Sequence, residues 1–409
     1  RVRTYTKNAA LFPERYRVVA AADPNPARLR QMEALVAPHP LRTFASDQEL
    51  FAAGKLADIL MIGTQDAYHV QPCIAAMRLG YDVLLEKPIA TNFAEVRQLE
   101  LEAARLGRRV LICHVLRYTP YYTLVKSLLD QGAVGTIATI NAVEGVAPFH
   151  QAHSFVRGHW GVVATSSPMI IAKCCHDLDI LSWLADAPCE HVSSFGSLSY
   201  FNAANAPAGA PERCTDGCPV AGQCFYDAHR YLTDQRHWLQ WVHNRGPEES
   251  DENILEWLRT SPWGRCVYRC DNTAVDRQTV NLAFANKITA TLTMTAFDSG
   301  RSLEVRGTEG VLLGGEAVKR MTGHDLVITR HRDGKPEYHD IPVLEGDYAG
   351  HGGGDYGLID ALDHEWRKPN FADMRSSLQR SVESHAMGFA AEEARLQGTV
   401  ISLPEFRRR

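Results

Sequence analysis

The sequence has no long apolar run and no excess of basic charge. No stretch approaches the roughly 20 apolar residues that a membrane-spanning helix needs. Its 43 Lys and Arg against 48 Asp and Glu give a formal net charge of −5, so no overall positive field attracts nucleic acid. No secretory leader is visible in the sequence. The sequence begins abruptly, so a leader could have been lost before its first residue. We therefore expect a cytoplasmic protein with neither nucleic acid nor membrane as a partner.

A glycine-rich dinucleotide loop is also missing. In a Rossmann domain this loop follows the first strand, and its backbone amides hold the pyrophosphate. No G-x-G-x-x-G occurs before Asp23. We interpret the first strand and its loop as lying outside the sequence, which would then begin in the last positions of the loop.

Strands and helices alternate through the first 120 residues. Apolar runs predict strands at 17–22, 58–62, 83–86 and 109–113. Helices are expected at 1–10, 27–36, 70–79 and 92–106, with a short one after Ser46. Near-continuous apolar strands are typical of a parallel sheet that is covered on both faces. With right-handed crossovers, residues 1–120 are predicted to form a Rossmann-like domain that binds NAD(P).

The remaining residues, 121–409, carry the strand and helix patterns of a second α/β domain. Strand patterns at 279–284 and 288–297 flank Ala285-Asn286-Lys287, which is a hairpin signal. Further strands are expected at 136–144, 303–306, 311–313 and 326–329, and helices at 168–184, 356–367 and 374–397. A chain of 409 residues is long enough for two such domains.

Polar residues stand at the ends of two predicted parallel strands. Glu86-Lys87-Pro88 ends one of them, and ligands bind at this edge of an α/β sheet. The alternative is that Glu86 and Lys87 are a solvent-exposed charge pair, which is the simpler interpretation when such a pair stands alone. Asp23 ends another strand, where a carboxylate accepts from a ribose hydroxyl and favours NAD over NADP. Arg28 could weaken that preference, and the alternative for Asp23 is a turn before Pro24.

Ten cysteines is a high count, and five of them gather in an irregular insert at about 201–271. Thiolates this close in a loop-rich segment predict a structural zinc site. A [4Fe–4S] cluster would use the same four thiolates, while disulfides or five unrelated thiols are the alternatives. The predicted ligands are Cys214, Cys218, Cys224 and Cys270, with Cys266 as the alternative fourth.

Several of these motifs, at these spacings, resemble the Gfo/Idh/MocA family of sugar and cyclitol oxidoreductases. The matching residues are Ala22-Asp23, Gly63-Thr64 with His69, Glu86-Lys87-Pro88, Arg117-Tyr118 with Pro120, His176-Asp177-Leu178-Asp179 and Gly307-Thr308-Glu309-Gly310. The resemblance implies an NAD(P)-dependent enzyme that transfers a hydride between nicotinamide and a hydroxyl of a sugar, cyclitol or glycoside. It also implies that the second domain is built on a large, mostly antiparallel sheet, and that a homodimer or homotetramer assembles through this sheet.

Two other functions stay open. The first is a glycosidase that holds NAD tightly and acts by transient oxidation, elimination and re-reduction. The second is a non-catalytic protein that binds a sugar or nucleotide, although retention of Lys87 and His176 argues against it.

The resemblance also assigns roles to residues. Lys87 orients the substrate oxygen and His176 acts as acid or base. Lys173 is a further catalytic candidate from its own position near His176, where the chain departs from the family. The implied cofactor-binding residues are Asp23, Arg28, Thr64, His69, Glu86, Lys87 and Arg117. The predicted substrate-binding residues, taken partly from the resemblance and partly from the residues themselves, are Lys87, His153, Arg157, Trp160, Lys173, His176 and Asp179.

The residues themselves support part of this assignment. Lys173, His176 and Asp179 share one face of the helix expected at 168–184, and clustered ionisable groups in an apolar helix indicate function. The loop expected at 150–160 mixes polar residues with Trp160, which suits a sugar. His351 to Asp355 could line the same pocket. The chain has Ala172 where many family members have Asp, so Lys173 is expected to lower the pKa of His176.

Overall fold

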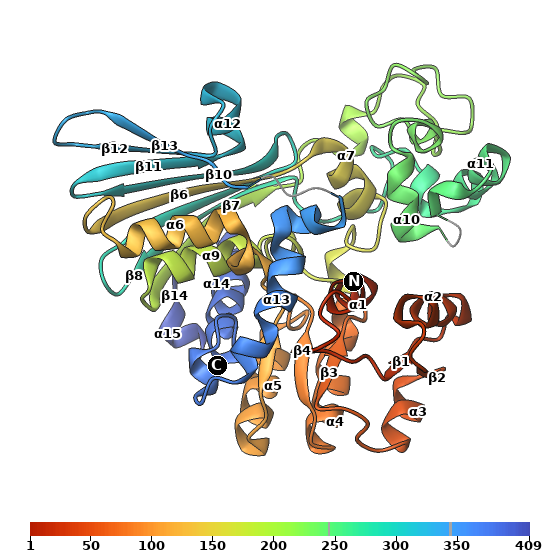
Figure 1. Cartoon of the computed structure of the whole chain (residues 1–409). Coiled ribbons are helices and arrows are strands. Elements are labelled where there is room, and N and C mark those ends of the chain that lie inside the picture. Colours follow the sequence, from red (N-terminus) through yellow and green to blue (C-terminus); the bar gives the residue numbers. More distant parts are fainter. Residues whose placement is uncertain (244–245, 343–345) are drawn as a thin grey trace.

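The computed structural model describes residues 1–243, 246–342 and 346–409. Figure 1 shows a parallel-sheet half at the bottom, a broad sheet above it and a separate insert at the upper right. None of the helices in these three segments is long and apolar enough to cross a membrane.

The N-terminal half has the alternation that the sequence predicts. Its strands are all parallel: β1 Ala20–Ala22, β2 Arg42–Phe44, β3 Ile59–Ile62, β4 Asp82–Leu85 and β5 Val110–Ile112. Its helices are α1 Val2–Ala9, α2 Pro26–Val36, α3 Asp47–Ala52, α4 Val70–Arg78 and α5 Phe93–Leu106. The side chain of Asn92 caps α5 by accepting from the backbone N–H of Glu95, which confirms the expected helix start. β1 and β2 form one two-stranded sheet, and β3, β4 and β5 form another sheet of three strands. Among the described residues, no strand pairs with both sheets.

The second sheet has nine strands in the order β13-β12-β11-β10-β6-β9-β8-β7-β14. Only β6 and β9 run parallel; the other neighbours are antiparallel. The predicted hairpin joins β8 to β9, and Lys287 in its turn has a positive φ of 72°. The strands are β6 Ile137–Val146, β7 Cys189–Ser197, β8 Arg277–Phe284, β9 Thr289–Thr295, β10 Ser299–Gly307, β11 Gly310–Gly315, β12 Leu326–Arg330, β13 Pro336–His339 and β14 Ile401–Ser402.

Helices cover one face of this sheet. Figure 1 shows α6 and α9 running along it between the sheet and the parallel half. The predicted helix at 168–184 is broken in the structure into α8 and α9, with Lys173 and Cys174 between them. The helices of this half are α6 Pro120–Asp130, α7 Pro148–His150, α8 Met169–Ala172, α9 Cys175–Ala185, α10 Leu239–Val242, α11 Asp251–Thr260, α12 Glu316–Thr322, α13 Gly354–Trp366, α14 Leu378–Gln397 and α15 Leu403–Phe406.

The last long helices return to the parallel half. Leu358 and Ile359 of α13 are buried in one apolar cluster with Tyr5, Leu84 and Leu111 of the N-terminal half. α14 contacts both β7 of the large sheet and α5 of the parallel half. The two halves are therefore joined by a shared core and do not pack as independent units.

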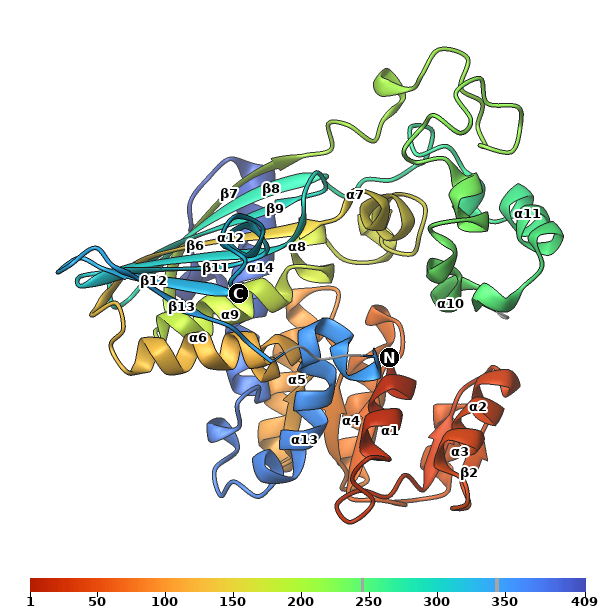
Figure 2. The same cartoon turned by 45° about the horizontal axis from the view of Figure 1, so that its top comes forward.

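The segment before α8 differs from its prediction. Residues expected as a loop form α7 followed by a π-helix, Gln151–Val156, all of whose side chains are buried. The cause is the insert between β7 and β8, which packs its apolar residues onto Phe149, Ala152 and Val156. In Figure 2 the insert, with α10 and α11, lies beside the coil labelled α7 and extends away from the sheet.

Candidate functional site

Lys87 lies at the carboxyl end of β4, where it reaches the second half of the molecule. Its Nζ donates to the carbonyl oxygen of Ala172 at 2.9 Å, and its backbone N–H donates to Glu86 Oε2 at 3.0 Å. Ala172 is the last residue of α8, and carbonyls at a helix end have no partner within the helix. The break between α8 and α9 therefore supplies the acceptor that holds Lys87 close to His176.

His176 lies in the first turn of α9 and is only 4% exposed. Its ring is 5.6 Å from that of His114 and 6.1 Å from that of His351, centroid to centroid. Its Nδ1 is enclosed without a hydrogen-bond partner in the described part of the chain. Burial, and then the charge of Lys87, lower the pKa of His176 well below its usual value. The ring is therefore neutral at neutral pH and free to accept a proton.

Lys173 has a different environment from the one expected. Its Nζ lies 3.2 Å from Glu144 Oε1, and Glu144 also pairs with Arg301 at 2.8 Å. Arg301 Nε in turn donates to Asp177 Oδ1 at 2.7 Å. The predicted lowering of the pKa of His176 is found, but burial and Lys87 lead its causes and Lys173 is not among them.

Arg117 and Asp179, expected to bind cofactor and substrate, bind each other. Arg117 Nε donates to Asp179 Oδ2 at 2.6 Å and Nη2 donates to Oδ1 at 2.8 Å. Their side chains are 2% and 1% exposed. A carboxylate buried this deeply needs a cation beside it, and the planar guanidinium meets both of its oxygens. The pair connects α9 to the segment after β5, so the structure favours a structural role.

The residues predicted as a sugar-binding loop divide between two neighbours. His153 Nδ1 lies 2.6 Å from the hydroxyl of Tyr231, and Arg157 Nη2 donates to the carbonyl of Tyr226 at 2.6 Å, so both face the insert. Trp160 turns the other way, and its Nε1 donates to Asp66 Oδ2 at 2.8 Å, just after β3. Of these three side chains, Trp160 is the one with a hydrogen bond to the parallel half in the described part of the chain.

Asp23 and Arg28 stand beside the carboxyl end of β1. Asp23 Oδ1 accepts from the backbone N–H of Asn25 at 2.8 Å, and Oδ2 lies 3.5 Å from Nη1 of Arg28. The carboxylate is thus fixed by its own turn and remains partly exposed.

Thr64 and His69 connect the loops that follow β3 and β4. The hydroxyl of Thr64 donates to the carbonyl of Tyr68 at 2.8 Å. The ring of buried His69 lies between two carbonyls, with Nδ1 2.7 Å from Pro88 O and Nε2 3.2 Å from Thr64 O. His69 therefore sets the position of Pro88, and with it that of Lys87.

Glu86 belongs to a buried charged network beside Lys87. It accepts from the hydroxyl of Tyr5 at 2.7 Å and pairs with Arg1 at 3.2 Å. Burial alone would raise the pKa of Glu86, but Arg1, Lys87 and the hydrogen bond from Tyr5 lower it overall. The carboxylate is therefore charged and stabilises the cation of Lys87.

His351 and Asp355, which the sequence allowed near this pocket, do lie close to it. Arg1 binds Asp355, and His351 Nδ1 lies 3.0 Å from Asp355 Oδ2. Since the His351 ring is 6.1 Å from that of His176, this segment borders the same site.

Sequence reasoning missed His114, which lies two residues after the end of β5. It is fully buried, both ring nitrogens lack a partner in the described segments, and its ring is 5.6 Å from those of His176 and His385. Its Nε2 is 3.9 Å from Asp179 Oδ1. A polar residue at the carboxyl end of a buried parallel strand was the available signal.

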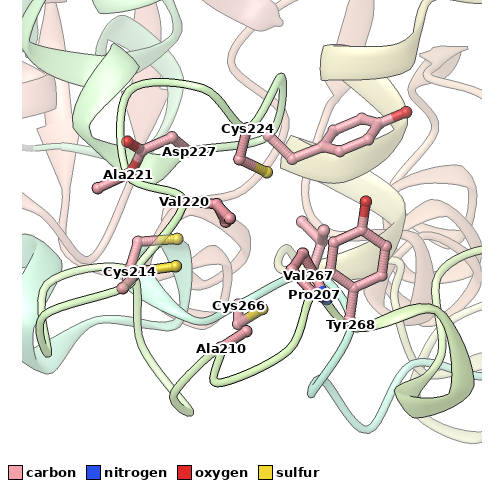
Figure 3. Close-up of a pocket in the computed structure, with 12 residues that line it drawn as sticks. Pro207, Ala210, Cys214, Val220, Ala221, Cys224, Asp227, Cys266, Val267 and Tyr268 are labelled. Atoms are coloured by element: carbon pink, nitrogen blue, oxygen red, sulfur yellow. The ribbon is translucent and has the colours of Figure 1, made fainter.

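The predicted metal ligands gather without forming a ready coordination site. Among the described residues, no group of three or more His, Cys, Asp or Glu could hold a metal ion as placed. Zinc and an iron–sulfur cluster thus have no direct support here. The insert's thiols that line a common cavity (Figure 3) are Cys214, Cys218, Cys224 and Cys266. Cys270, the first choice for fourth ligand, instead directs its Sγ to the Cys266 carbonyl at 3.3 Å.

Two family models match the chain. One is described as an oxidoreductase family with an NAD-binding Rossmann fold and matches residues 3–114. The other is described as a GFO/IDH/MocA C-terminal domain and matches residues 122–313.

Individual proteins are similar at lower identity. The 1-carboxy-3-chloro-3,4-dihydroxycyclo hexa-1,5-diene dehydrogenase of Comamonas testosteroni is 23% identical over 60% of this chain and 60% of its own length. Inositol 2-dehydrogenase of Gluconacetobacter diazotrophicus is 29% identical over 33% of this chain and 36% of its own. The chain thus matches less than two thirds of the length of either relative.

Solved structures share the fold over nearly the whole chain. The WlbA dehydrogenase of Bordetella pertussis, solved in complex with NADH and UDP-GlcNAcA, superposes with a TM-score of 0.66. The alignment covers 98% of this chain and 94% of that one at 17% identity, which supports the fold alone. The two matched models, which together span most of the chain, place it in the Gfo/Idh/MocA family of NAD(P)-binding oxidoreductases.

Proposed function

We propose that the protein is an NAD-dependent dehydrogenase that oxidises a hydroxyl of a sugar or cyclitol. The observation that carries this proposal is the meeting of Lys87 and His176 at the carboxyl end of β4. A cation from the parallel half and a neutral imidazole from α9 interact there, although they are far apart in sequence.

The two side chains have complementary tasks in alcohol oxidation. His176, neutral at neutral pH, accepts the proton of the substrate hydroxyl. The ammonium of Lys87 stabilises the negative charge that develops on that oxygen. The buried, unpartnered Nδ1 of His176 fits a site completed by a ligand.

The chain's residues also fit the dinucleotide. Asp23 presents a carboxylate after β1, where it would accept from the adenosine ribose hydroxyl and repel a 2′-phosphate. This chemistry supports NAD rather than NADP. When bound, the nicotinamide supplies the acceptor for the hydride.

The substrate class rests on the relatives and on the site's polar character. Inositol 2-dehydrogenase is named for a cyclitol, and the WlbA structure contains a nucleotide sugar. The alternative is a glycosidase with tightly bound NAD, since the same two side chains would serve it. We further propose a cytoplasmic location, which the ten free cysteines support.

We propose assembly into a homodimer or homotetramer through the uncovered face of the large sheet. Phe195 is 70% exposed on β7. Its cross-strand partner Thr279 on β8, and the partner of Thr279 on β9, Thr293, continue the same face. Such a face of small polar residues with an exposed aromatic suits burial against a second copy.

The deciding experiment is a substrate screen with two readouts. The purified protein is incubated with a panel of sugars, cyclitols and aryl glycosides, and NADH formation and aglycone release are followed in parallel. We expect NADH formation that requires added NAD, with no aglycone released. Aglycone release without added cofactor and without net NADH would establish the glycosidase instead. If neither NADH nor free aglycone is formed, both proposed activities are excluded for the substrates in the panel.

The pH profile tests the role of His176. Below its pKa the ring is protonated and cannot accept the substrate proton, so activity falls with acid. Because burial and Lys87 lower that pKa, we expect kcat/KM to hold through pH 6.5 and to fall only well below it. His176→Gln should remove this acid limb and lower kcat/KM by roughly 10²- to 10⁴-fold. The control His364→Gln, on the exposed side of α13, should change neither. An acid limb that survives in His176→Gln would exclude His176 as the base.

A further inference from the structure

His351 and Asp355 form a hydrogen-bonded pair at the N-terminal end of α13. His351 Nδ1 lies 3.0 Å from Asp355 Oδ2, and Asp355 Oδ1 accepts from Arg1. Arg1 Nη2 also lies 3.3 Å from His351 Nδ1, a longer contact than the one to the carboxylate. Because a carboxylate only accepts hydrogen bonds, we assign the proton of the neutral ring to Nδ1. Asp355 thus fixes the tautomer of His351 in which Nε2 is an acceptor.

The backbone holds His351 in a conformation that few residues other than glycine adopt. Its φ of 49° and ψ of 42° lie in the left-handed region, and the next residue, Gly352, has a φ of 63°. This conformation is unfavourable for histidine, and residues held in it gather at functional sites. The segment after it is fixed because Gly354 packs on Val115, where a Cβ would lie 2.4 Å from the carbonyl oxygen. The fold therefore maintains an uncommon backbone conformation at His351.

His351 and His176 present two ring nitrogens to the same site. Their ring centroids are 6.1 Å apart, with 51° between the ring planes. The side chain of His351 is 38% exposed, so a ligand can reach it. Nδ1 of His176 is enclosed, so its Nε2 is the nitrogen that can contact a ligand. In the described part of the chain, Nε2 of neither ring has a hydrogen-bond partner.

Both rings are neutral at neutral pH, so both Nε2 atoms can accept. Burial is the main cause that lowers the pKa of His351, and it outweighs the opposing effect of Asp355. The charges of Arg1 and Lys173 act in the same direction as burial. The site therefore offers two neutral imidazole acceptors side by side, one of which His176 uses for the reacting hydroxyl.

We propose that the substrate is a vicinal diol, and that His351 accepts a hydrogen bond from the hydroxyl next to the one that reacts. This inference rests on the proposed dehydrogenase and narrows the class of its substrate. Neighbouring hydroxyls on a sugar or cyclitol ring hold their oxygens close enough for one to donate to each imidazole. The reacting hydroxyl gives its proton to His176 and its carbon gives a hydride to nicotinamide. The second hydroxyl keeps its proton, so one carbonyl forms.

This arrangement makes His351 a specificity residue. A site built to bind a hydroxyl rejects an analogue that lacks it, because the buried polar group is then left unpaired. Asp355 holds the proton on Nδ1, so the ring cannot turn Nε2 into a donor without losing that hydrogen bond. The neighbouring position of the substrate must therefore carry a donor, and an acceptor alone does not suffice.

The test compares three ligands on wild type and on His351→Asn. They are the best diol from the substrate screen, its analogue with hydrogen in place of the neighbouring hydroxyl, and its analogue with fluorine there, which cannot donate. We expect wild-type kcat/KM to be lower by about 10²-fold or more for both analogues. Asparagine tolerates the left-handed backbone but is shorter than histidine. His351→Asn should therefore lose about tenfold or more on the diol, mainly through KM, and the ratio between diol and analogues should approach one.

The outcomes separate this inference from the dehydrogenase itself. Wild type that oxidises the diol and both analogues equally well would overturn the role of His351 and leave the dehydrogenase standing. Loss of kcat together with the acid limb in His351→Asn would make His351 the base, which also overturns the proposal. Wild type that forms no NADH from any ligand would remove both. His364→Asn, exposed on α13, should leave the ratio unchanged.

A second measurement needs no activity. ¹⁵N NMR of the histidine rings in the ligand-free protein reports their tautomers, and the signals of His351 are those missing from His351→Asn. We expect the Nδ1–H form at neutral pH in wild type and a mixture of tautomers in Asp355→Asn, because the carboxylate no longer fixes the proton. An Nε2–H form of His351 in wild type would overturn its role as an acceptor.

Discussion

Replacing Lys87 with methionine is expected to lower kcat/KM by about 10²- to 10³-fold, the usual cost of removing one donor from a developing oxyanion. Methionine keeps most of the side-chain volume and removes the charge, so packing at the end of β4 should survive. The bond to the Ala172 carbonyl is also lost, which should cost about 1 kcal/mol of folding stability. Steady-state kinetics on the best substrate of the screen, with thermal unfolding alongside, separates the two effects.

Two comparison variants make the Lys87 result specific. Lys87→Arg keeps the positive charge but changes its shape and should recover only part of the activity. Lys126→Met removes a lysine from α6 that pairs with Asp130 at the surface, and activity should be unchanged. If Lys87→Met retained activity within a few-fold of wild type while folding normally, Lys87 would have no catalytic role.

Breaking the buried pair between Arg117 and Asp179 should produce the largest loss of stability. Arg117→Met leaves a carboxylate that is only 1% exposed without its cation, and such changes typically cost about 3–5 kcal/mol. Urea unfolding followed by circular dichroism measures this as a lower free energy of unfolding. A loss of this size would make the pair a main link between α9 and the segment after β5.

A double variant tests whether the cost arises from the unpaired charge. Combining Arg117→Met with Asp179→Leu removes both charges, and most of the lost stability should return because apolar side chains then fill the site. Arg105→Met, which removes an exposed pair with Glu102 on α5, should leave the unfolding midpoint nearly unchanged. If Arg117→Met were as mild as Arg105→Met, the pair would contribute little. Activity lost without loss of stability would restore the predicted binding role.

Much of the fold could be predicted because its signals are local. Apolar runs located β3, β4 and β5, and the cap Asn92 marked the start of α5 where the structure has it. The hairpin between β8 and β9 followed from strand patterns on either side of a short polar turn. Strand β7 was missed, because its burial alternates only weakly and its sequence mixes Ser, Gly and Cys.

The candidate site was only partly predictable. Lys87 and His176 were named together, and the structure brings them together. Arg117 was predicted to bind the cofactor and Asp179 the substrate, but the two side chains form an ion pair with each other. The sequence shows which residues are charged, but it does not show which of them come together in the core. His153 and Arg157 were expected at the substrate but face the insert, whose packing on the π-helix no local pattern indicates.

The sequence by itself determined the α/β class, the order of most strands and helices, and the polar residues at the ends of the parallel strands. These depend on hydrophobic periodicity, capping and turn chemistry, which act over a few residues. Only the tertiary structure decided that α13 and α14 return to the parallel half, that α8 ends where its carbonyl can hold Lys87, and that thiols from two stretches of the insert line one cavity. Those outcomes depend on which surfaces exclude water together and which buried charges find a partner, and both are settled between segments far apart in the chain.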